Sequence, residues 1–174
     1  MKNYGKKIAA LLMMVCVVAM LTACAGFGKK AAFAQYGQSL NSDSDYWNEL
    51  TDAASRVSSS SDVTTVKAVV QARIIPALTT IQANAKSRNA GITDSEIKAL
   101  DDHYVACVDR LLEGFTYMLD GLNTNDMSKI NKGNAAVTQA NTELGDWVDG
   151  IDKFMKNNNI KDDGSIASVK QMIQ

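Results

Sequence analysis

TDSEIKALDDHYVACVDRLLEGFTYMLDGL, residues 93–122, is the stretch that decides the fold. Its first four residues form a capping-box pattern, and Ile92 precedes them as a hydrophobic staple for Ile97. Apolar residues then recur every three or four positions, which is the period of an amphipathic α-helix. The apolar stripe is broad, so we expect this helix to be the most buried one. It comprises Ile97, Leu100, Tyr104, Cys107, Leu111 and Met118, flanked by Val108, Leu112, Phe115, Leu119 and Leu122.

Two helices are predicted before this stretch. Residues 31–58 form the first, with a break expected at residues 41–45, which are rich in cap-forming side chains. Asp43 occupies a position in that segment where the pattern calls for an apolar residue. Residues 62–88 form the second helix, whose apolar spacing gains one residue beside Pro76. Proline removes a backbone donor inside a helix, so we predict a kink there.

One long helix is predicted after it, at residues 127–157. Gly133 and Ala140 lie on a line that carries Trp147 and Phe154 further along, so we expect close helix packing first and bulky aromatic packing later. Four helices joined by short links predict an all-α, antiparallel up-down four-helix bundle over residues 31–157. For residues 158–174 the pattern leaves two alternatives, a C-terminal tail or a short fifth helix from about Ser165.

The N-terminal residues have the composition of an export signal. Three lysines and no acidic residue lie in positions 1–7, and an uncharged run of about 14 residues extends from Ile8 to Leu21. This run is shorter than the roughly 20 residues that span a bilayer. It ends in Leu21-Thr22-Ala23-Cys24, which resembles the lipobox of bacterial lipoproteins with a type II signal peptide.

The resemblance implies how the chain is processed and where it resides. Residues 1–23 would be a signal peptide, recognised at Leu21, Thr22 and Ala23 and cleaved before Cys24. Cys24 would carry a diacylglycerol and an N-acyl chain such as palmitate, and residues 24–30 would tether the bundle. Membrane lipid is then the first partner, at the extracytoplasmic face of the cell membrane or at an outer membrane in a Gram-negative cell. No specific family is identified for the mature domain.

Charge and composition narrow the function classes. Without residues 1–23, the chain keeps 15 basic and 19 acidic residues, a net charge of about −4. A nucleic-acid-binding protein would show a basic face, so we expect no nucleic-acid partner. Haem attachment and di-iron motifs are missing from the sequence, and apart from the acyl groups we predict no cofactor and no metal.

His103 and Cys107 are the residues that most resemble a reactive pair. They lie four positions apart, so they share a helix face, where they form a candidate metal site or thiol site. Cys107 belongs to the apolar stripe, however, and the chain has no second histidine. We therefore predict no catalytic residue and a protein that is not an enzyme.

Two binding functions fit the remaining pattern. The first is a lipid-anchored scaffold or binding module with an unidentified envelope protein as its partner. The alternative is a small-ligand sensor or carrier whose interhelical pocket is lined by Gly133, Asn134, Ala140 and Asn141. Trp47 and Trp147 are expected in the core.

Overall fold

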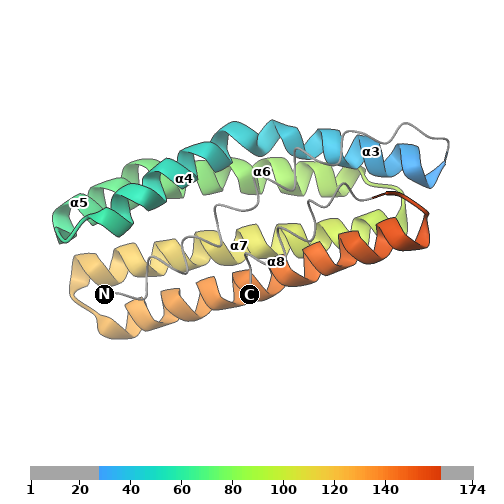
Figure 1. The fold of residues 1–174 in the computed structure, drawn as a ribbon. Coiled ribbons are helices and arrows are strands. Elements are labelled where there is room, and N and C mark those ends of the chain that lie inside the picture. Colours follow the sequence, from blue (N-terminus) through green and yellow to red (C-terminus); the bar gives the residue numbers. More distant parts are fainter. Residues whose placement is uncertain (1–27, 162–174) are drawn as a thin grey trace.

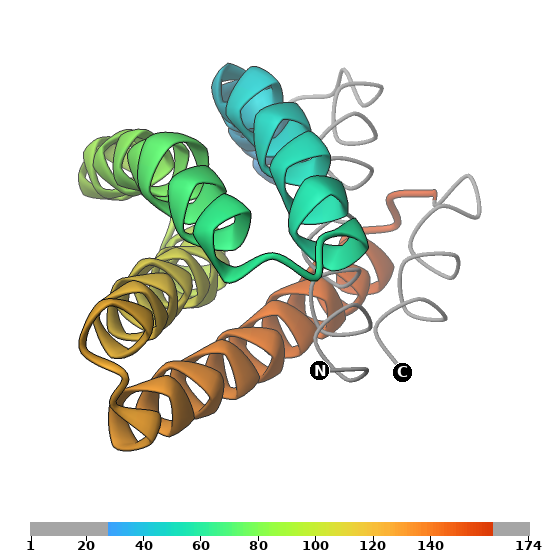
Figure 2. The ribbon, with the colours of Figure 1, turned by 90° about the vertical axis from the view of Figure 1, so that its left-hand side faces the viewer.

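The computed structural model describes residues 28–161, which form a bundle of four antiparallel helical rods (Figure 1). The rods surround one core when the bundle is viewed from its end (Figure 2). The predicted all-α bundle is confirmed, and no strand occurs in residues 28–161. The lipobox, Cys24, most of the tether and the expected helix from Ser165 lie outside these residues.

The first rod consists of α3 (Lys29–Leu40) and α4 (Ser44–Ser59). A single 3₁₀ turn, η2 (Asn41–Asp43), joins them at the predicted break. Asp43 is fully buried at this turn and caps no helix with its side chain. The helix begins two residues earlier than the predicted start at residue 31.

The second rod begins with α5 (Val63–Val69) and ends with α6 (Ile75–Gly91). Between them lies η3 (Val70–Ile74), a π-helical turn in which the Ile75 backbone N–H donates to the Val70 carbonyl. A π turn accommodates one extra residue, and Pro76 is the second residue of the helix that follows it. The extra residue in the apolar spacing therefore lies in this turn, where the helix winding changes, and the kink at Pro76 stays a prediction.

The third and fourth rods are single helices, α7 (Ser95–Thr124) and α8 (Met127–Asn157). Asp94 and Asp126 cap their N-termini by accepting backbone N–H groups, as Asp62 does for α5. Capping satisfies backbone donors that the first turn of a helix leaves free. The α7 cap is one residue later than a capping box starting at Thr93 would place it.

The α7–α8 pair packs closely because glycines meet at its contact. A Cβ atom added to Gly133 would lie 2.6 Å from the Gly114 carbonyl oxygen, and one on Gly114 would lie 2.9 Å from the Gly133 carbonyl oxygen. Gly121 faces the Ile130 backbone in the same way. The predicted close packing at the start of α8 is confirmed.

The core follows the predicted stripes. Trp47 and Trp147 are fully buried, as expected, and Phe33 stacks on Phe154 with ring centroids 4.7 Å apart. The π turn contributes Val70 and Ile74 to the same core. Among the residues described, no helix combines the length and apolar character needed to cross a membrane.

We predict that Gly133→Ala destabilises the protein and that Gly145→Ala does not. The new methyl group at 133 meets the α7 backbone, and such overpacking costs about 1–3 kcal/mol. A Cβ at Gly145 meets nothing within 4 Å, so alanine should raise the free energy of unfolding by about 0.5–1 kcal/mol. Urea unfolding of both variants measures the difference. Equal effects at the two positions would contradict glycine-mediated packing of α7 on α8.

Candidate functional site

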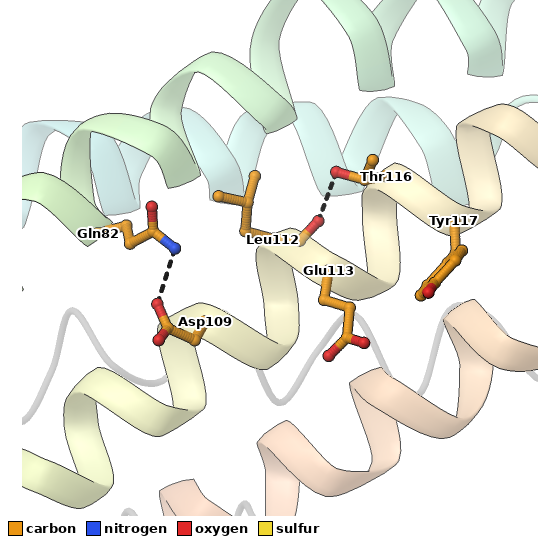
Figure 3. A pocket seen from close by; sticks show the side chains of 6 residues that line it. All are labelled: Gln82, Asp109, Leu112, Glu113, Thr116 and Tyr117. Carbon is orange, nitrogen blue, oxygen red and sulfur yellow. Dashed lines mark hydrogen bonds between the residues drawn. The ribbon is translucent and has the colours of Figure 1, made fainter.

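An open surface groove of about 440 Å³ lies along α7 (Figure 3). Gln82 of α6 and Asp109 close one end, where the Gln82 amide donates to the Asp109 carboxylate at 2.7 Å. Tyr117 stands at the other end (Figure 3). The lining combines apolar with polar and acidic surface: Gln82, Asp109, Leu112, Glu113, Thr116 and Tyr117.

Internal bonds hold several of these lining groups in place. Lys86 lies 3.0 Å from Asp109, and Arg110 lies 2.8 Å from Glu113. The Thr116 hydroxyl donates to the Leu112 carbonyl of its own helix at 2.7 Å (Figure 3). The groove is thus formed by side chains on helices, and its one aromatic ring, Tyr117, lies at one end.

Exposed apolar side chains collect at one end of the bundle. Val63, Tyr117 and Met127 are the large hydrophobic residues most exposed in the described range, at 50%, 38% and 63%. Val63 begins α5 and Met127 begins α8, both at the end opposite the start of α3 (Figure 1). Lys29 at that start forms an ion pair with Glu96 of α7. Tyr117 is 21 residues beyond Glu96, or about 30 Å along α7.

The bundle centre contains a buried ionic cluster that the sequence did not reveal. Arg88 of α6 donates through Nη1 to Asp43 at 3.1 Å and through Nε to Asp101 of α7 at 3.0 Å. Both carboxylates are fully buried, and the Arg88 side chain is 8% exposed. Asn84 also donates to Asp43, at 2.9 Å. Asp43 therefore has more donors than Asp101, whose Oδ2 has no hydrogen-bond partner.

Four aromatic side chains surround this cluster. Tyr104 donates to Asp43 at 2.9 Å and accepts the Trp47 indole N–H at 3.0 Å. The Trp147 indole donates to the Tyr36 hydroxyl at 2.9 Å, which links α8 to α3. The Arg88 guanidinium also lies over the Tyr104 ring, 4.6 Å from its centroid, in a cation–π contact. Every rod of the bundle thus contributes to one polar and aromatic centre.

Burial dominates the protonation of this centre. It raises the pKa values of Tyr36 and Tyr104 well above the usual range, so both hydroxyls stay protonated and able to donate. Burial also raises the pKa of Asp101, outweighing the attraction of Arg88. For Arg88, burial opposes the charge, but the neighbouring carboxylates of Asp101 and Asp43 outweigh it and raise its pKa. The arginine stays charged, and Asp101 is the member whose ionisation is least compensated.

His103 and Cys107 have different surroundings, as the stripe predicts. Cys107 is buried in the core, while His103 is half-exposed and lies 2.7 Å from Glu143 of α8. Burial, with a smaller contribution from the Glu143 charge, raises the pKa of the Cys107 thiol far above its usual value. A neutral buried thiol is a poor nucleophile and a poor metal ligand. The structure therefore brings His103 to carboxylates and leaves Cys107 as a core residue.

The predicted pocket residues on α8 are not arranged around a space at Gly133. The Gly114 backbone and Met118 of α7 occupy the position next to Gly133, and Ala140 is fully buried. Asn134 and Asn141 are partly buried. Because Gly133 has no side chain, α7 and α8 can pack closely at this position.

Comparison with known proteins gives no match. No family model, no curated protein and no solved structure is similar to this chain.

We predict that Arg88→Met destabilises the protein by about 3–5 kcal/mol, because it leaves two buried carboxylates without their cation. The triple variant Asp43→Asn, Arg88→Met, Asp101→Asn should recover part of this loss, since it removes all three charges. Arg56→Met is the matched control, because Arg56 pairs with Asp52 at the surface and should change little. Denaturant unfolding reports each value. A small effect of Arg88→Met would mean that the carboxylates are compensated without it.

We also predict that Cys107 resists alkylation in the folded protein. In a Cys16→Ser, Cys24→Ser variant, Cys107 is the only thiol, and its burial and raised pKa protect it at pH 8. Iodoacetamide followed by mass spectrometry should detect little adduct in native buffer and one adduct per chain in guanidinium. Rapid native labelling would show that the thiol is accessible.

Proposed function

We propose that this protein is a lipid-anchored, non-enzymatic binding or scaffold module of the cell envelope. Its partner is a second envelope protein, which binds the α7 groove and the apolar end of the bundle. The observation that carries the proposal is the distribution of exposed apolar side chains. Val63, Tyr117 and Met127 lie far from Lys29, whereas the anchor expected at Cys24 precedes Lys29.

The distances support a role in which one end is held and the other binds. Lys29 lies five positions after Cys24, and a chain of that length reaches at most about 18 Å. The start of α3 would thus stay close to lipid. Tyr117 lies about 30 Å further along the bundle, on the same continuous helix that Lys29 contacts through Glu96. A rigid rod with a short tether would present its groove at a fixed distance from the anchor.

The chemistry of the groove supports a protein partner. Tyrosine is enriched at protein-binding surfaces, whose rim is polar, and Tyr117 is the exposed aromatic residue of this groove. Leu112 adds apolar surface on the side of the groove that faces α6 (Figure 3), and the carboxylates of Asp109 and Glu113, paired with Lys86 and Arg110, make its margin polar. A partner segment with an apolar side chain and a basic residue would fit this lining.

Site-specific crosslinking in intact cells tests the proposal. A photo-reactive amino acid in place of Tyr117 should capture a specific envelope protein. The same substitution at Ser55 should not, because Ser55 is exposed on α4, across the bundle from α7 (Figure 2). Cys24→Ser should move the protein out of the membrane fraction and reduce capture by at least about tenfold, since the anchor concentrates both partners at one surface.

Two results would contradict the proposal. Equal capture from positions 117 and 55 would mean that the groove has no special partner. Unchanged membrane association of Cys24→Ser would remove the lipid anchor from the argument, whatever the crosslinks show.

A further inference from the structure

His103 lies on α7 against two carboxylates of α8. Its Nδ1 atom is 2.7 Å from Glu143 Oε2, and Asp146 lies three positions further along α8, on the same helix face. One potential ligand atom from each of these three residues lies within 4.8 Å of the other two. Histidine nitrogen and carboxylate oxygen are both ligands of zinc.

The surrounding charges favour a cation at this cluster. Between Lys132 and Lys153, α8 has no lysine or arginine, so Glu143 and Asp146 have no positive neighbour on their own helix. The nearest basic residues of α7 have other partners: Lys98 bonds to Asn89, and Arg110 bonds to Glu113. The cluster therefore contains two carboxylates, and its only basic side chain is the imidazole of His103.

The cluster is also accessible to an ion from solvent. The side chains of His103 and Glu143 are 44% and 32% exposed, and Asp146 is exposed. Gly145, between the two carboxylates in sequence, leaves open space where another residue would place a Cβ. Cys107, one turn along α7 from His103, takes no part because it is buried in the core.

We propose that His103, Glu143 and Asp146 bind a divalent transition-metal ion, best matched by Zn²⁺, between α7 and α8. Zinc takes nitrogen and oxygen ligands at about 2.0–2.2 Å and accepts three protein ligands with water in the fourth position. The three ligand atoms lie within 4.8 Å of one another. Small rotations of their side chains would therefore bring all three to zinc-ligand distance from one ion. The imidazole disfavours Mg²⁺ and Ca²⁺, which prefer all-oxygen sites.

The single histidine of this chain makes the test direct. The full-length protein is purified through a histidine-free tag, treated with chelator and titrated with Zn²⁺ by calorimetry. The imidazole resonances of His103 are followed by NMR in the same titration. We expect one saturable zinc per chain, a shift of the His103 resonances that saturates with it, and no displacement by excess Mg²⁺.

Variants separate this site from adventitious zinc. His103→Gln, Glu143→Gln and Asp146→Asn should each weaken zinc binding by more than about tenfold, since loss of even an outer-shell partner has that effect. Asp45→Asn, which removes an exposed carboxylate at the α3–α4 turn, should leave binding unchanged. Absence of saturable binding, or His103 resonances that do not respond to zinc, would overturn the proposal even if a variant failed to fold. Equal loss in Asp45→Asn would also overturn it, by indicating nonspecific attraction to acidic surface.

Discussion

The buried contact of Arg88 with Asp43 and Asp101 constrains how the four rods can assemble. Its three members come from the α3–α4 turn, from α6 and from α7, so one guanidinium fixes three segments at once. Tyr104 joins the same cluster and packs on Trp147 of α8, with ring centroids 5.4 Å apart. A sliding or rotation of the first, second or third rod would leave a charge buried without its partner, and this is costly in a low-dielectric core. Apolar packing alone tolerates such shifts far better.

The interruption of the first rod lies at one member of this cluster. Residues 41–43 form a 3₁₀ turn, which winds more tightly than the α-helices on either side. Asp43 emerges from that turn into the core, where Asn84, Arg88 and Tyr104 all donate to its carboxylate. Such a buried ion pair adds little net stability, because its attraction is largely offset by the desolvation cost of its charges.

The sequence predicted what depends on local periodicity. The bounds of α7 and α8, the winding change beside Pro76 and the close packing at Gly133 all follow from spacing along one helix. Asp43 showed as a polar residue in an apolar position, but its partner Arg88 is 45 residues away and resembled an ordinary basic residue at a helix end. The same reason hid Glu143 as the neighbour of His103. Pairing between side chains on different helices depends on how the rods are aligned, and the apolar spacing within one helix carries no information about that alignment.

The two ends of the α7–α8 pair are built differently, and this bears on where each proposed site lies. Gly114, Gly121 and Gly133 bring the helices together toward the α7–α8 turn, and no side chain fits between them there. Toward the start of α3, Trp147 and Phe154 fill the interior instead, and His103 and Glu143 meet at the outer edge of the pair. A metal ion at that edge would join the helices in the half where Gly150 packs on the Leu100 side chain and no two glycines meet. The surface proposed for a protein partner would then lie on the half whose geometry the glycines already fix.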